Sequence, residues 1–124
     1  MRSVRVIARR TLNDFVKNRV DPRHQQAVKD HLDSWYAEAA KATWKSPAEL
    51  KAQYGSASIV SSERAVFNIK ANDYRLVVAI SYTCQVLLII WMGTHKEYDK
   101  VNVEKVEYDK SRYADPSDSD RARP

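Results

Sequence analysis

Residues 74–92 read YRLVVAISY-TCQ-VLLIIWM. β-Branched, aromatic and aliphatic side chains fill both outer runs, and this composition is typical of strands. The three residues between the runs are enough for a hairpin turn and too few for a crossover connection. The stretch therefore predicts two neighbouring antiparallel strands, the second of which is apolar on both faces.

Shorter strand-like runs flank this hairpin. Residues 57–61 and 65–70 precede it, with turn-forming residues between them and before residue 74. Successive strands with short links predict an antiparallel meander. A short first strand is expected at residues 4–7, and three valines between residues 101 and 106 suggest a last short element.

The residues between the first strand and the meander carry helical spacing instead. Leu12, Phe15, Val16 and Val20 recur at the interval of one helical face. A second helix is expected over residues 22–43, and a third begins after Ser46, whose side chain is a suitable N-cap. We therefore predict an α+β fold in which N-terminal helices pack on a small antiparallel sheet of three or four strands.

The length of the chain limits the number of domains, and its charge indicates the kind of partner. The 124 residues suit one domain. Residues 1–53 hold 11 Lys and Arg against 6 Asp and Glu, and the whole chain has a formal net charge of +5. The helical half thus attracts an acidic partner: nucleic acid, an acidic protein or an anionic membrane surface. Few large apolar residues occur near the end, so we expect a domain at 1–106 and a disordered polar tail at 107–124.

Several classes of site are not expected. Cys84 is the only cysteine, which excludes an internal disulfide, and its apolar surroundings predict a buried thiol. His24 and His31 have no carboxylate at ligand spacing, so we expect no metal and no cofactor. No run approaches the ~20 apolar residues of a membrane span. The first residues lack the apolar core of a signal peptide, so a cytoplasmic location is expected.

Four stretches resemble the HigB toxin family, part of the wider RelE/ParE group. They are Phe67-Asn68-Ile69, the hairpin Asn72-Asp73-Tyr74-Arg75-Leu76-Val77, the segment Thr94-His95-Lys96-Glu97-Tyr98-Asp99, and the proline-containing helix Trp44–Lys51. Their order and spacing agree with the family from about Trp35 to Val106. The segment after the strand is the most specific, because it places several polar residues in a set order.

The resemblance implies a fold and a set of partners. It implies a RelE-like toxin that cuts mRNA while the message lies in the A site of the 30S ribosomal subunit. It also implies a cognate antitoxin, a HigA-like helix-turn-helix protein. The antitoxin binds operator DNA, and the toxin is held on this DNA only through the antitoxin. The N-terminal extension and the tail are less typical of the family.

Four residues are the candidate catalytic group. A metal-independent ribonuclease uses the 2′-OH of RNA as nucleophile and needs a proton acceptor, a proton donor and a cation for the phosphate. His95 is the leading acid or base, because an imidazole exchanges protons near neutral pH. Arg75 and Lys96 suit phosphate oxygens, Arg75 through a bidentate fork. Tyr98 either stacks on a base or donates its hydroxyl.

Further residues are candidates for RNA contact. They are Lys70, Asn68, Asn72, Lys45 and Lys51. For each of them an ordinary structural role is the alternative: a solvated lysine, or an asparagine that forms a turn. Arg75 has the alternative of a salt bridge to Asp73 or Glu97. Glu97 itself either orients His95 or Lys96 or follows the chain outward.

Two other functions remain open from the sequence. One is a non-catalytic module whose sheet only receives an antitoxin, which includes a degenerate toxin that has lost its activity. The other is a ParE-like toxin with a different target. Neither requires an acid or base histidine, so the presence of His95 beside Lys96 and Tyr98 favours the nuclease.

Overall fold

The computed structural model describes residues 3–71 and 73–114. Its elements in chain order are β1 (Arg5–Ile7), α1 (Arg9–Arg19), α2 (Gln25–Lys41), α3 (Pro47–Gln53), β2 (Ser58–Ser61), β3 (Arg64–Ile69), β4 (Tyr74–Ser81), β5 (Val86–Thr94), α4 (His95–Tyr98) and the 3-10 helix η1 (Lys110–Tyr113). The α+β prediction is confirmed. So is the N-cap of the third helix, where Ser46 Oγ accepts from the backbone N–H of Glu49.

The sheet is mixed, with strand order β1-β5-β4-β3-β2. Strands β2 to β5 form the expected antiparallel meander. Strand β1 joins the other edge and runs parallel to β5. This direction is available because α1, α2 and the meander separate the two strands, which gives the chain room to cross over. The sheet therefore has five strands where the sequence predicted three or four, because the expected first strand joins it at the edge.

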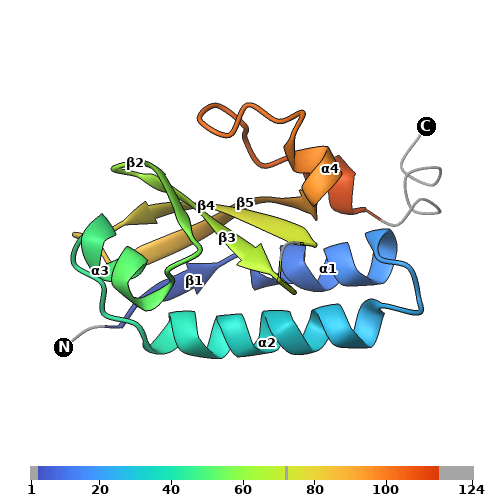
Figure 1. The fold of residues 1–124 in the computed structure, drawn as a ribbon, viewed down its shortest axis with the longest axis horizontal. Helices are drawn as coiled ribbons and strands as arrows, with labels where there is room; N and C mark the ends of the chain where they lie inside the picture. Colours follow the sequence, from blue (N-terminus) through green and yellow to red (C-terminus); the bar gives the residue numbers. More distant parts are fainter. Residues whose placement is uncertain (1–2, 72, 115–124) are drawn as a thin grey trace.

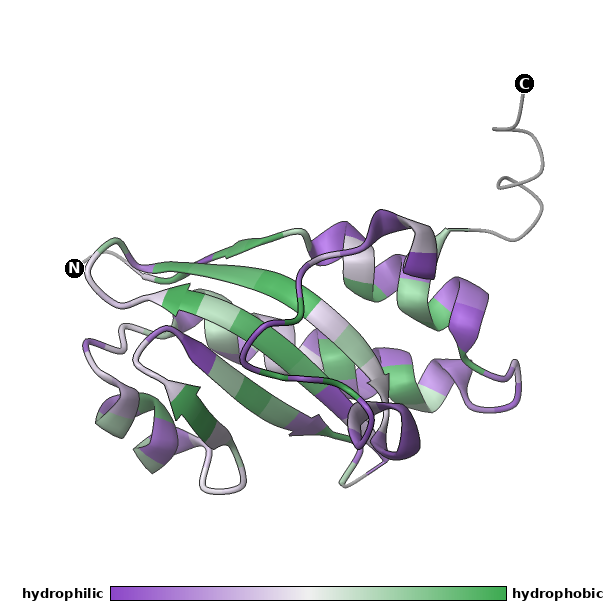
Figure 2. Ribbon diagram, turned by 90° about the horizontal axis from the view of Figure 1, so that it is seen from above, coloured by the Kyte–Doolittle hydropathy of each residue, from purple (hydrophilic) through white to green (hydrophobic). Residues whose placement is uncertain are grey.

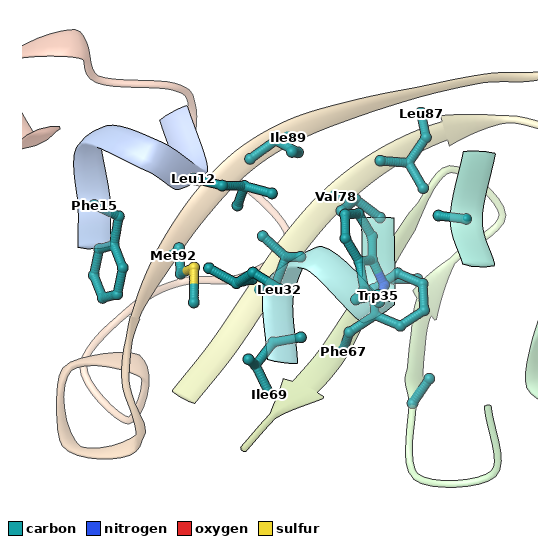
Figure 3. Packing of buried hydrophobic residues seen from close by; sticks show 14 of the residues in the cluster. Leu12, Phe15, Leu32, Trp35, Phe67, Ile69, Val78, Leu87, Ile89 and Met92 are labelled. Carbon is teal, nitrogen blue, oxygen red and sulfur yellow. The ribbon is translucent and has the colours of Figure 1, made fainter. Parts of the chain in front are cut away.

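Helices α1 and α2 cover one face of the sheet, as Figure 1 shows. Their apolar stripes meet the inward side chains of β3, β4 and β5 in a single core (Figure 3). At its centre Trp35 packs edge-on against Phe67, with ring centroids 5.3 Å apart. The core is built from the helical positions and the alternate strand positions that periodicity predicts.

The opposite face of the sheet, turned upward in Figure 1, is the upper face. It carries a second, smaller apolar cluster of Val66, Val77, Ile90 and Trp91. The segment that follows α4 crosses the upper face of the sheet (Figure 2), and its Val103 and Val106 pack against this cluster. Arg64 holds the segment there by donating to the carbonyls of Val103 and Val106 at 3.1 and 2.6 Å. The upper face is thus closed over its centre by a loop rather than by a helix.

Strand β1 is shorter than β5, so the last part of β5 has an open edge. In the antiparallel pairing Met92 lies opposite Leu76. The Met92 N–H donates to the hydroxyl of Tyr113 at 3.0 Å, and its carbonyl accepts from Arg112 Nε and Nη2 at 3.2 and 3.1 Å. Two side chains of η1 therefore satisfy the backbone groups that a further strand would have paired.

These contacts correct the expected start of the tail. Residue Tyr113 is 1% exposed, and its carbonyl accepts from Asn18 of α1 at 2.9 Å. Residues 107–114 therefore belong to the folded part rather than to a tail that starts at 107. One large aromatic in a polar segment was enough to dock it. Residues 115–124 lie outside the described residues.

Cys84 is a second correction. The sequence predicted a buried thiol, but Cys84 is exposed. It lies in the turn between β4 and β5, where the Cys84 N–H donates to Ser81 Oγ at 3.1 Å. The apolar residues on either side are those of the two strands, and the turn itself projects away from the core.

Replacing Tyr113 with Phe tests whether η1 closes the edge of β5. The variant keeps the ring but leaves the buried Met92 N–H without its acceptor. We expect the free energy of unfolding to fall by about 1–3 kcal/mol in urea titrations. Tyr108→Phe is the matched control, because Tyr108 is 45% exposed. It should change stability by less than about 0.5 kcal/mol. Equal effects of the two substitutions would contradict the closing role.

Candidate functional site

Helix α4 begins where β5 ends and brings His95 to the upper face. Thr94 is the N-cap: its hydroxyl accepts from the Glu97 N–H at 3.2 Å, and Glu97 Oε1 accepts from the Thr94 N–H at 2.9 Å. This reciprocal capping box starts a helical turn directly after a buried strand. The His95 N–H donates to the carbonyl of Asp73 at 3.0 Å, which ties α4 to the turn before β4.

Arg75 and His95 are in direct contact. Arg75 pairs across the sheet with Gly93, and its Nη2 lies 3.0 Å from His95 Nδ1. A guanidinium can only donate hydrogen bonds, so Nδ1 must accept this one and the imidazole proton lies on Nε2. That Nε2 is 3.8 Å from Asp99 Oδ2. For the alternative of an ion pair with Glu97, the structure places Glu97 against two other arginines.

Tyr98 completes the cluster from the other end of the same helical turn. The Arg75 guanidinium carbon lies 5.9 Å from the centre of the Tyr98 ring. The same ring packs at a tilt against Trp91, with centroids 6.3 Å apart. Arg75 is thus in reach of both an imidazole and a phenol. We define the Arg75 cluster as Arg75, His95 and Tyr98.

Glu97 faces away from this cluster and binds two arginines. Its Oε2 is 2.9 Å from Arg19 Nη2 of α1 and 3.0 Å from Arg112 Nη2 of η1. Partial burial alone would raise the pKa of Glu97. The hydrogen bonds from Thr94 and Arg112 and the charges of both arginines outweigh burial and hold the pKa below its ordinary value.

Arg112 lies on the upper face, directly over Gly93. Its guanidinium carbon is 4.6 Å from the centre of the Trp91 ring. A Cβ at Gly93 would lie 2.5 Å from Arg112 Nη2 and from the Trp91 ring. A glycine inside a strand marks a close approach of another group, so Gly93 was the available signal for this contact. Sequence reasoning missed both Arg112 and Arg19.

The remaining candidates divide by position. Asn68 pairs with Arg75 across β3 and β4, so both lie on the upper face. The Asn68 amide donates to the carbonyl of Ser56 at 3.1 Å. Lys70 lies in the adjoining turn, 3.6 Å from Asp73. Lys96 is exposed on α4. Asn72 is outside the described residues.

Lys45 and Lys51 are not brought to the cluster. Lys45 is exposed and follows Trp44, whose carbonyl accepts from Gln85 in the β4–β5 turn, at the opposite end of the hairpin from His95. The Lys51 ammonium donates to the carbonyls of Gly55 and Ala57 at 2.7 and 2.6 Å. Its charge therefore stabilises the loop that follows α3.

The structure also bears on metal and membrane binding. Within residues 3–71 and 73–114, no three His, Cys, Asp or Glu side chains lie together as a metal site would require. Among these same residues, none of the helices has both the length and the apolar character needed to cross a bilayer.

Comparison with known proteins places this arrangement in context. A family model described as HigB_toxin, the RelE-like toxic component of a toxin-antitoxin system, matches residues 28–101. The match covers more than half of the chain and includes the whole Arg75 cluster. Arg19 and Arg112 lie outside it. No curated protein matches the chain closely enough to indicate a relationship.

The lowered pKa of Glu97 predicts a pH dependence of stability. Because the folded-state pKa lies below the ordinary value of 4.5, ionised Glu97 stabilises the fold above that pH, and this contribution is lost as the pH falls through the folded-state pKa. Glu97→Gln lacks the charge. We therefore expect its Tm to lie below that of the wild type at pH 7, and the gap to narrow steadily below pH 4.5. A gap that stays constant down to pH 3 would contradict the ion pair.

Proposed function

The chain belongs to the HigB toxin family, the RelE-like toxic components of toxin-antitoxin systems, and we propose that it is a metal-independent endoribonuclease. In this proposal it cuts mRNA in the A site of the translating 30S subunit, in the cytoplasm. Membership of the family implies an antitoxin partner. We propose a HigA-like helix-turn-helix protein, through which alone the toxin reaches operator DNA.

The contact between Arg75 and His95 is the observation that carries the proposal. A proton-transfer group and a phosphate-binding cation lie 3.0 Å apart on one face, next to a tyrosine. RNA cleavage through the 2′-OH needs these functions within the span of one phosphodiester. A binding module has no chemical need for an imidazole at this position.

The chemistry starts with a change of partner for Arg75. In the free protein His95 Nδ1 accepts from Arg75 and is therefore occupied as a base. A bound phosphate draws the guanidinium into a bidentate contact with its oxygens. Nδ1 then takes the proton of the 2′-OH. The 2′-oxygen forms its bond to phosphorus while the bond to the 5′-oxygen breaks, which leaves a 2′,3′-cyclic phosphate.

The leaving 5′-oxygen needs a proton, and we assign this step to the Tyr98 hydroxyl. The Tyr98 ring lies beside Arg75, and its hydroxyl bears a proton that it can donate. Lys96 is exposed on the same turn and adds a point charge for the phosphate oxygens. Asn68 and Lys70 extend the positive and polar surface along β3 toward the neighbouring nucleotides.

The charge distribution supports a ribosomal substrate. The lysine and arginine excess of residues 1–53 belongs to the helical half, from which Arg19 reaches Glu97 of α4. Exposed cations are available on this half for rRNA phosphates; one is Arg10 on α1, whose side chain is 91% exposed although its Nε lies 3.6 Å from Asp14 Oδ2. Lys45 belongs to this outer set rather than to the cleavage site.

Substitutions in the Arg75 cluster test the activity on ribosomes programmed with mRNA, with cleavage mapped by primer extension. His95→Ala should lower the cleavage rate by roughly a hundred- to ten-thousand-fold. Arg75→Ala should lower it by about a hundredfold or more, because the developing charge loses its fixed cation. Tyr98→Phe keeps the ring and should still bind mRNA, but cleave it slowly.

His31→Ala is the matched control, since this histidine is exposed on the helical half. It should leave cleavage near the wild-type rate. Wild-type rates in both His95→Ala and Arg75→Ala would overturn the assignment of the site. Equal cleavage of free and ribosome-bound mRNA would overturn the ribosome dependence, and no cleavage by the wild type would favour a binding module or a ParE-like target.

A further inference from the structure

We propose that the ion pair of Glu97 with Arg112, completed by Arg19, is the positioning device that holds His95 against Arg75. The proposal rests on the nuclease function for its catalytic consequence. Its structural part, that the two arginines fix α4, stands on the contacts alone.

Helix α4 has too little structure of its own to stay folded. It contains four residues, and one turn of helix is unstable in isolation because nucleation is unfavourable. The capping box fixes its start, and two backbone bonds from Asp99 and Lys100 close its end. None of its residues is buried. The bond from the His95 N–H to Asp73 and the packing of Tyr98 on Trp91 hold α4 to β4 and β5, and the side of the turn that faces α1 and η1 needs an attachment of its own.

Glu97 supplies this attachment. It follows His95 by two positions, so the two side chains leave the helical turn in different directions. While His95 contacts Arg75, the Glu97 carboxylate reaches Arg19 and Arg112 at 2.9 and 3.0 Å. Its other oxygen holds the Thr94 N–H. One carboxylate thus joins the cap of α4 to α1 and to η1.

Arg112 is in turn held rigidly, so it can act as an anchor. Its side chain is 18% exposed, and it spans the Trp91 ring, the Met92 carbonyl and the Glu97 carboxylate at once. The absence of a side chain at Gly93 makes room for it. Tyr113, which follows it, is buried in the core. The guanidinium is therefore fixed from both sides before it meets Glu97.

Helix α1 contributes the second cation that binds Glu97. Arg19 lies in the last turn of α1, and its Nη1 also donates to the carbonyl of Arg112 at 3.5 Å. Glu97 is then held by cations from two separate elements, which fixes its carboxylate in two directions rather than one. Segments near the two ends of the chain, 93 residues apart, therefore meet at the turn that carries His95.

Two variants remove the ion pairs of Glu97 and leave the capping box of α4 in place. Glu97→Gln keeps an oxygen that accepts from Thr94, since glutamine also serves in capping boxes, but it loses the charge that binds the arginines. Arg112→Met keeps the length of the side chain and removes the cation. Asp33→Asn is the matched control, because it removes an exposed carboxylate that pairs with Arg9 and Lys29 on the helical side.

Hydrogen exchange measured by NMR tests the structural part without any enzymatic assay. In Glu97→Gln and Arg112→Met we expect the amides of Glu97 and Asp99 to exchange about tenfold faster or more, while Val77 and Val78 in β4 keep wild-type rates. In Asp33→Asn none of these amides should change. Wild-type exchange in α4 of both variants would overturn the proposal. So would equal acceleration in α4 and β4, because it would mean general destabilisation.

Cleavage of ribosome-bound mRNA tests the catalytic part. A positioning role predicts a kcat about tenfold lower or more with KM nearly unchanged, because substrate binding stays intact while the base is misplaced. Arg112→Lys should restore part of kcat by restoring the ion pair. A wild-type kcat in Arg112→Met would overturn the catalytic part. If the wild-type protein cuts no RNA, the proposed function fails and the exchange rates alone decide the positioning proposal.

Discussion

The pairing of β4 with β5 places Arg75 opposite Gly93, and the site depends on this register. Alternate residues of a strand face opposite sides of the sheet, so a slip of one residue would turn Arg75 into the core between the sheet and the helices α1 and α2. The register includes a bulge: Val77 pairs with Trp91 and Val78 with Ile89, which leaves Ile90 without a partner. Beyond this bulge Trp91 and Gly93 lie on the upper face. There Arg112 contacts the Trp91 ring, and Arg75 lies opposite Gly93.

The two faces of the sheet are covered in different ways. The lower face is packed against α1 and α2 and carries most of the buried apolar side chains. The upper face is closed by a loop that Arg64 holds and by the single turn of α4. Tyr98 and the valines of the loop pack against the small upper cluster, and charged and hydrogen-bonded side chains add to this packing in positioning the upper segments. The Glu97 ion pairs provide that positioning at the end of the sheet where His95 lies.

Local patterns predicted the parts of the structure that depend on neighbouring residues. Alternation and short links identified the meander, and helical spacing identified α1 and α2. The family resemblance brought Arg75 and His95 together, and the structure places them in contact. The parts that depend on distant residues were missed. Nothing near Arg112 or Tyr113 in the sequence indicates that they will meet Glu97 and Met92.

The errors have related causes. The segment 107–114 is polar, and composition alone assigned it to a tail, although one buried tyrosine docks it. The hydrogen bonds of Lys51 to two loop carbonyls were likewise not predicted, because a solvated lysine and one bound to carbonyls look alike in sequence. Cys84 has apolar neighbours, yet it lies in the turn rather than in either strand. In each case the side chain's surroundings come from the tertiary structure.

The most direct measurement is a cryo-electron microscopy structure of the protein on a ribosome programmed with mRNA whose nucleotides at the A-site codon lack the 2′-hydroxyl. We predict that one A-site phosphate lies within hydrogen-bonding distance of the Arg75 guanidinium and that the adjoining 2′ position faces His95 Nδ1. An mRNA bound along α1 and α2, or at the end of the sheet near Lys45, with Arg75 and His95 facing solvent, would contradict the account.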